Sequence, residues 1–236
     1  PLIASKMLTE KKSPNEFGIS YMHEEDKIND FKKQVLLPYS QSQNGPFIDK
    51  ADVNNDGLTD FFVGGAAGQS GELYFQTKEG SFKKDENTIW NTDKSFEDLG
   101  VLFFDYDADG DLDLYIASGS AAFDENNAKY QDRLYKNDGK GNFSNSNSLP
   151  KNNTSNQKVI ANDFDNDGDL DLFVGGRVIP DKYPYTPKSQ LLINDKGIFT
   201  DQTKELAPQL LEAGLITDAV FSDYDNDGDS DLIITA

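Results

Sequence analysis

Residues 163–174 carry aspartates in a pattern that suits a metal ion. Aspartate stands at positions 1, 3, 5, 7 and 9 of this loop, and Gly168 stands at position 6. Alternation lets several oxygens converge on one centre, and Ca²⁺ takes roughly six to eight oxygen ligands. Glycine permits the sharp turn that a residue with a Cβ would resist. Position 7, Asp169, is expected to contribute its backbone carbonyl. The pattern therefore predicts a calcium-binding loop.

The pattern occurs four times. The first copy has Asn at position 3 and Leu at position 7, and both changes keep an oxygen donor because position 7 binds through the main chain. Any single copy could be a solvated acidic turn, but four copies in register favour up to four Ca²⁺ sites, one per repeat. The predicted metal ligands are Asp52, Asn54, Asp56, Leu58, Asp60, Asp105, Asp107, Asp109, Asp111, Asp113, Asp163, Asp165, Asp167, Asp169, Asp171, Asp223, Asp225, Asp227, Asp229 and Asp231.

The residues that follow each loop indicate strands on both sides of it. An EF-hand needs a bidentate Glu at position 12 and a helix on each side. Position 12 is instead always apolar and β-branched, and each loop runs into a short apolar stretch typical of a strand. The four position-12 residues are Val63, Ile116, Val174 and Ile234. The sequence therefore excludes the EF-hand and predicts a loop that joins two strands.

The loops belong to a longer repeat. Their first residues are separated by 53, 58 and 60 residues, and a glycine-rich link, a third strand, a Gly-containing turn and a fourth strand follow the early loops. Four strands per period of this length are typical of a propeller blade. We therefore predict an all-β protein, a β-propeller of four-stranded blades with the calcium loop between strands 1 and 2 of each blade.

The repeats also suggest how the chain is divided. Residues 45–236 are predicted to hold blades that start near residues 45, 98, 157 and 217, and the last blade lacks its third and fourth strands. We therefore expect the remainder of a longer propeller chain. Residues 1–44 are expected to form an N-terminal segment with an outer strand over residues 2–9. Ile28, Phe31 and Val35 have helical spacing, which predicts a short helix within residues 26–37.

The composition explains the acidity of the chain. The formal net charge is −20, and the four loops contain 18 of the 42 acidic residues. The other 24 acidic residues nearly balance the 22 basic ones, so the charge belongs to the predicted metal sites. No Lys/Arg stripe offsets this field, which argues against nucleic acid as a partner. No apolar run is long enough for membrane insertion, and the absence of Cys excludes a thiolate metal site.

With these motifs described, the chain resembles a known family. The D-x-D-x-D-G-x-x-D loop between strands, followed by Val-Gly-Gly, resembles the FG-GAP or VCBS-type repeat of integrin α-like propellers and of many bacterial secreted proteins. Asp-Gly-Asp-Leu-Asp-Leu-Tyr and the later segment 132–139 are similar to bacterial proteins of the ASPIC/UnbV type. The resemblance covers residues 45–236 and implies a propeller whose loops carry Ca²⁺.

No enzyme constellation is evident in the sequence. His23 is the single histidine and is predicted to be a solvated surface residue. Without a second His or a Cys, the usual nucleophile–base pairs are missing, and the glycine-rich segment 64–71 lacks the lysine of a P-loop. We therefore predict that the protein is not an enzyme. The links between strands 2 and 3, and those from strand 4 to strand 1 of the next blade, should share the face opposite the loops. The candidate ligand-face residues are Arg177, Tyr183, Tyr185, Phe123 and Trp90.

The leading functional hypothesis is a binding module. We expect a non-enzymatic, extracellular, calcium-binding β-propeller that binds a protein or carbohydrate surface, as in cell adhesion, with structural Ca²⁺. It would work outside a bacterial cell, at the cell surface or in the periplasm, where millimolar calcium suits such sites. The alternatives are an accessory propeller segment of a secreted polysaccharide-acting enzyme, or a lectin with one sugar site per repeat.

Overall fold

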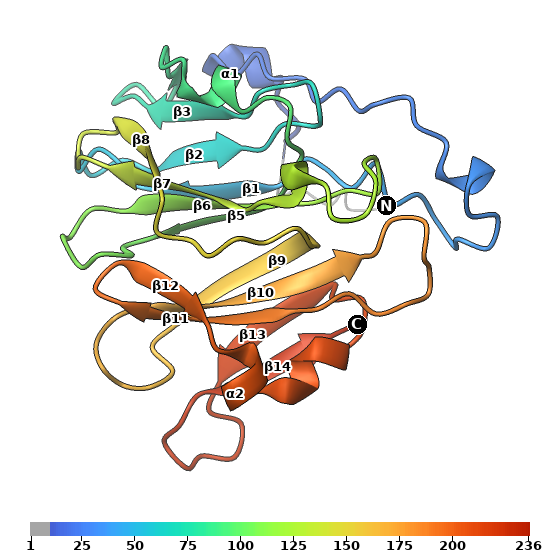
Figure 1. Cartoon of the computed structure of the whole chain (residues 1–236). Helices are drawn as coiled ribbons and strands as arrows, with labels where there is room; N and C mark the ends of the chain where they lie inside the picture. Colours follow the sequence, from blue (N-terminus) through green and yellow to red (C-terminus); the bar gives the residue numbers. More distant parts are fainter. Residues whose placement is uncertain (1–9) are drawn as a thin grey trace, which may run out of the picture.

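The computed structural model describes residues 10–236, and its strands form antiparallel sheets that follow one another along the chain (Figure 1). Three sheets have four strands, the last has two, and strands pair in sequence order. The first sheet contains β1 (Ile48–Ala51), β2 (Asp60–Val63), β3 (Glu72–Gln76) and β4 (Phe82–Lys84). The second contains β5 (Asp98–Phe104), β6 (Asp113–Ser118), β7 (Arg133–Asn137) and β8 (Phe143–Ser146). The third contains β9 (Ser155–Asn162), β10 (Asp171–Val178), β11 (Gln190–Asp195) and β12 (Ile198–Asp201), and the fourth β13 (Asp218–Ser222) and β14 (Asp231–Thr235).

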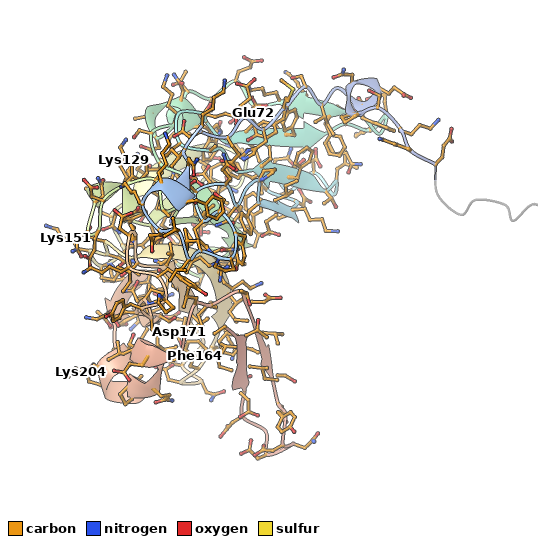
Figure 2. All side chains as sticks on the ribbon, turned by 90° about the vertical axis from the view of Figure 1, so that its right-hand side faces the viewer. Glu72, Lys129, Lys151, Phe164, Asp171 and Lys204 are labelled. Carbon is orange, nitrogen blue, oxygen red and sulfur yellow. The ribbon has the colours of Figure 1, made fainter. Side chains whose placement is uncertain are left out.

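The sheets are the blades of a propeller arc. Seen from the right-hand side of Figure 1, they follow one another around an open arc (Figure 2). Each acidic loop joins the first and second strands of its sheet. The structure thus confirms the predicted all-β class, the four-stranded blades and the place of the loops. We call the sheets blades 1 to 4 in chain order.

All the helices within residues 10–236 are short. They are η1 (Pro14–Phe17), η2 (Asp30–Lys32), η3 (Ala128–Tyr130), η4 (Pro208–Glu212), α1 (Ile89–Thr92) and α2 (Thr203–Leu206). Within residues 26–37 the structure has only the 3-10 helix η2, and Phe31 and Val35 are 43% and 81% exposed. The helical spacing of these residues therefore does not correspond to a buried face of a helix. The outer strand expected over residues 2–9 lies outside the described residues.

The core lies between blades. A four-stranded sheet has two apolar faces, and stacking against neighbours covers both. β6 and β10 are accordingly buried along their whole length. One apolar cluster joins blades 1 and 2, a second joins blades 2 and 3, and a third packs blade 3 against η4 and β13. Each blade thus depends on its neighbours for a complete core.

Strand direction separates the connections into two sets. Because neighbouring strands are antiparallel, the acidic loops and the hairpins between the third and fourth strands open at the same end of the blades. The links between second and third strands open at the opposite end. In Figure 1 the acidic loops of blades 2 and 3 project to the left, and that of blade 4 projects toward the bottom of the view. The two ends therefore present different chemistry.

Candidate metal centres

All four acidic loops share one backbone turn. The residue at position 4 has a left-handed φ between 57° and 61° in every loop. The position-6 glycines Gly57, Gly110, Gly168 and Gly228 have φ values between 85° and 101°. Such angles cost glycine little, while Asn tolerates them better than most side chains. Position 4 is Asn in three loops and Ala108 in the second. The sequence thus folds each loop into the same curve.

The aspartate at position 1 holds the turn closed. Asp105 accepts hydrogen bonds from the backbone N–H of Asp109 (3.2 Å) and of Gly110 (2.9 Å). The position-1 residues Asp52, Asp163 and Asp223 accept the equivalent pair of bonds. This carboxylate therefore faces the inside of the loop in every repeat.

The aspartate at position 9 joins the loop to its blade. Asp113 accepts from the N–H of Tyr106 at position 2 (3.2 Å) and from the N–H of Asn137 at the end of β7 (2.8 Å). Asp60 and Asp171 make the same two bonds in blades 1 and 3. All three position-9 residues are fully buried, whereas Asp231 is exposed and bonds to the N–H of Tyr224 alone among its loop neighbours. Position 9 thus closes the loop and anchors it on the third strand.

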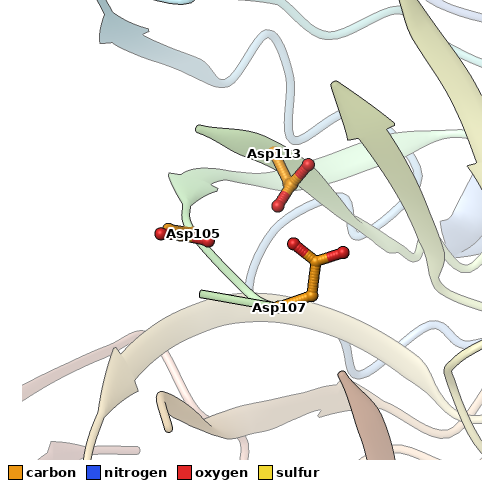
Figure 3. Close-up of side chains that lie close together, drawn as sticks. All are labelled: Asp105, Asp107 and Asp113. Carbon is orange, nitrogen blue, oxygen red and sulfur yellow. The ribbon is translucent and has the colours of Figure 1, made fainter. Parts of the chain in front are cut away.

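Three loops bring carboxylates together at one point. Figure 3 shows Asp105, Asp107 and Asp113 turned toward a common centre. One oxygen from each lies within 4.8 Å of the others. The residues of the equivalent clusters are Asp163, Asp165 and Asp171 in blade 3 and Asp223, Asp225 and Asp231 in blade 4. These are the position 1, 3 and 9 ligands that the spacing predicts.

An unpaired oxygen tests whether a cation fits. Oδ1 of Asp107 is buried and has no hydrogen-bond partner among the described residues. A buried acceptor without a partner costs roughly 1–3 kcal/mol, and more when it is charged. A cation at the centre of the cluster would satisfy this oxygen. Since the donors are carboxylate and carbonyl oxygens, the residues fit a hard divalent cation such as Ca²⁺.

The first loop is chemically different. Asn54 stands at position 3, where its amide donates to Oδ2 of Asp56 (3.2 Å) and its Oδ1 accepts from the N–H of Asp56 (3.1 Å). Asp52, Asp56 and Asp60 keep their places, and Leu58 at position 7 can offer only its main chain. This loop therefore carries fewer charges than the other three.

Side chains at positions 5 and 7 have separate partners. In each loop the position-5 aspartate, Asp56, Asp109, Asp167 or Asp227, accepts from the N–H of position 7. At position 7, Asp111 accepts from the Asn55 amide of blade 1 (3.1 Å), and Asp169 accepts from the N–H of Lys196 (2.8 Å). Asp229 is exposed. These contacts leave the position-7 carbonyl as the expected ligand.

Burial and like charge make the position-9 carboxyl groups less acidic. Burial raises the pKa of Asp113 to about 7, and the neighbouring Asp107 and Asp109 add to the rise, while backbone N–H groups offset part of it. Burial likewise raises the pKa of Asp60 and of Asp171. A carboxyl group in this position favours a proton or a bound cation over an isolated negative charge.

In blades 2 and 3 an asparagine on the third strand ties the loop to the loop of the blade before it. Asn137 donates to the carbonyl oxygens of Val53 (2.7 Å) and Leu112 (3.0 Å), which belong to loops of neighbouring blades. In blade 3, Asn194 donates in the same way to Tyr106 (2.8 Å) and Leu170 (3.1 Å). The sequence alone did not predict this contact. Its signal is the Asn that precedes both Gly-containing hairpins, visible once the repeats are aligned.

Two predicted ligand-face residues are buried instead. Trp90 is 6% exposed and packs between blades 1 and 2, with ring centroids 5.0 Å from Phe62 and 5.1 Å from Tyr135. Arg177 is 5% exposed and donates to the carbonyl oxygen of Leu215 (2.9 Å). Assigning them to a ligand face was wrong because both are enclosed by segments distant in sequence.

The other three ligand-face residues remain accessible to different degrees. Tyr185 is 70% exposed. Tyr183 is half-buried, and its N–H donates to Gln34 of the N-terminal segment (2.6 Å). Phe123 is half-buried beside Tyr130, with Lys129 Nζ 4.5 Å from its ring centroid. Tyr185 is therefore the residue of this set that presents most of its side chain.

The histidine does not lie free on the surface. The side chain of His23 is 12% exposed, its Nδ1 lies 3.0 Å from the Tyr21 hydroxyl, and its Nε2 lies 2.8 Å from Oε1 of Glu25. The Tyr21 hydroxyl donates to the carbonyl oxygen of Gly64 (2.7 Å). The prediction of a solvated histidine was wrong, since this group fastens the N-terminal segment to the glycine-rich link of blade 1.

Comparison with known proteins gives one family. The profile described as FG-GAP-like repeat matches residues 52–116 and 119–174, which include the first three loops. No curated protein matches the chain. Within residues 10–236, none of the helices combines the length and apolar character needed to cross a bilayer.

Proposed function

We propose that this chain, which belongs to the FG-GAP-like repeat family, is an extracellular, non-enzymatic β-propeller module that binds Ca²⁺ in its acidic loops and uses the opposite face for a protein or carbohydrate surface. The observation that carries the proposal is the recurrence of one ligand geometry. Three loops place the carboxylates of positions 1, 3 and 9 within 4.8 Å of one another.

The role of the metal follows from what the loops connect. Position 9 binds both the loop and the third strand, while the third-strand asparagine reaches the preceding loop. A cation at each centre would neutralise clustered carboxylates whose mutual repulsion otherwise opposes folding. Calcium sites of extracellular modules often have Kd values near 10⁻⁴–10⁻³ M, which suits a structural ion outside the cell.

Thermal unfolding with and without calcium tests the metal. A ligand at 100 times its Kd stabilises the folded state by about 2.7 kcal/mol per site, so excess Ca²⁺ should raise Tm by several degrees over EDTA. Asp163→Ala should reduce this gain, and Asp195→Ala, whose side chain is 82% exposed in a neighbouring hairpin, should not. An identical Tm in Ca²⁺ and EDTA refutes the proposal.

The partner face is proposed from exposed groups at the end opposite the loops. A groove of about 240 Å³ lies between blades 2 and 3, lined by Glu125, Thr154, Thr186 and Lys188 among others. Hydroxyl, amide and charged groups of this kind can bind sugar hydroxyls or a polar protein surface, and exposed Tyr185 adds contact area. The test compares Tyr185→Ser with the unmodified chain for binding to a glycan array and to a bacterial surface extract. If the two bind equally well, this face is not the binding face.

A further inference from the structure

A lysine side chain from β7 lies against the loop of residues 105–113. Nζ of Lys136, on β7, forms ion pairs with Oδ2 of Asp107 and with Oδ2 of Asp109 (2.9 Å). These aspartates stand at positions 3 and 5 of the loop. The Lys136 side chain is 41% exposed and that of Asp107 only 17%. An ammonium group thus sits against two of the carboxylates expected to hold the metal.

The matching positions in blades 1 and 3 carry no charge. Gln76, Asn137 and Asn194 are equivalent, because the N–H of each donates to the position-9 aspartate of its own loop. The residues just before them are Phe75, Lys136 and Ile193. Blade 2 therefore has an ammonium where blades 1 and 3 have apolar side chains.

We propose that Lys136 is an internal counter-ion that lowers the calcium affinity of loop 105–113 below that of loop 163–171 and holds this loop together without calcium. The inference rests on the proposed calcium binding. Lys136 offsets carboxylate repulsion without metal, and it repels a second cation at the same centre. Asp107 Oδ1 stays unpaired, so the loop keeps an oxygen for the metal. The site is weakened rather than abolished.

The ammonium group of Lys136 also has an effect of the opposite sign. By holding Oδ2 of Asp107 and Oδ2 of Asp109, Lys136 also restrains these two side chains, and such restraint would strengthen binding. The two roles differ in sign, because removal of the ammonium tightens binding in the first case and weakens it in the second. A measurement on each loop separately therefore decides between them.

The position-6 glycines allow such a measurement. The Gly110 N–H donates to Asp105 (2.9 Å) and the Gly168 N–H donates to Asp163 (3.1 Å), so each amide signal in an NMR spectrum of the full chain reports its own loop. Titration with CaCl₂ should move Gly168 at lower concentration than Gly110. In Lys136→Met the Gly110 midpoint should fall about tenfold, as loss of one nearby unit charge implies.

The controls keep the outcomes separate. Lys140→Met removes the same charge from an exposed position in the β7–β8 hairpin and should change neither midpoint by more than about twofold, since exposed charges are screened. In EDTA, Lys136→Met should have a lower Tm than Lys140→Met. A Gly110 midpoint that stays or rises in Lys136→Met overturns the inference and leaves calcium binding intact. If neither glycine signal responds in the unmodified chain, the proposed function fails, and the inference fails with it.

Discussion

Replacing Glu97 with glutamine should stabilise the protein at alkaline pH and leave it nearly unchanged at acidic pH. Glu97 is 2% exposed, just before β5. Burial raises the pKa of its carboxyl group from 4.5 to about 8, the carboxylates of Glu25, Asp26 and Asp98 add to the rise, and the Ser120 hydroxyl offsets part of it. Glutamine has the shape of the protonated acid and no charge to bury.

The sign of the pH effect follows from where the proton is lost. The unfolded chain releases it near pH 4.5 and the folded chain near pH 8. Between these values the folded chain holds more protons, so the free energy of unfolding falls as the pH rises. This contribution is fully present below pH 4.5 and is lost as the pH passes through 8. At roughly 1.4 kcal/mol per pH unit, the interval amounts to at most about 5 kcal/mol.

Urea unfolding followed by tryptophan fluorescence measures this difference. Trp90 is the single tryptophan and lies in the core between blades 1 and 2, so its emission reports that core. With calcium held constant, Glu97→Gln should gain about 2–4 kcal/mol over the unmodified chain at pH 8.5 and less than about 0.5 kcal/mol at pH 4.5. Exposed Glu79→Gln is the matched control. Parallel stability–pH curves for Glu97→Gln and the unmodified chain would refute the reasoning.

Two further substitutions test contacts between blades. Asn194→Ala removes the hydrogen bonds to the carbonyl oxygens of Tyr106 and Leu170. Because these buried carbonyls lose their donor, the free energy of unfolding measured in urea should fall by about 2–4 kcal/mol. The control Asn145→Ala, at an exposed position, should lower it by less than about 0.5 kcal/mol. Trp90→Ala should lower the free energy of unfolding, measured by calorimetry, by about 3–5 kcal/mol, because it empties a packed aromatic site. A change near zero would contradict the buried position of Trp90.

The acidic loops could be predicted because their requirements are local. A cation needs oxygens that converge, and within nine residues alternation and one glycine supply them. The structure bears out the carboxylate convergence in blades 2 to 4. The position-4 residue, whose left-handed φ also shapes the turn, gave a weaker signal because Ala108 occupies it in one loop. The blade pattern was equally readable because the same order of strands and turns recurs.

Burial of single residues could not be predicted in the same way. Trp90 lies among polar residues in a link between blades, which is typical of an exposed aromatic. Its core position depends on Phe62 and Tyr135, 28 and 45 residues away in sequence. His23 is enclosed because Tyr21 reaches Gly64, a contact that no local pattern encodes. The burial of these two side chains depends on contacts between segments distant in sequence, and those contacts form only when the chain has folded.

Each of the two asparagines, Asn137 and Asn194, bonds to the loop of the preceding blade. Asn194 of blade 3 binds the carbonyl of Tyr106, while the N–H of Tyr106 binds Asp113 within the loop of blade 2. The two peptide groups that flank position 2 of one loop are therefore held by its own position-9 aspartate and by the blade that follows. Asn137 does the same for Val53, so the arrangement repeats. The loop that contains Asp113 is thus joined to the next blade, and calcium bound as we propose would stabilise the same backbone as blade stacking.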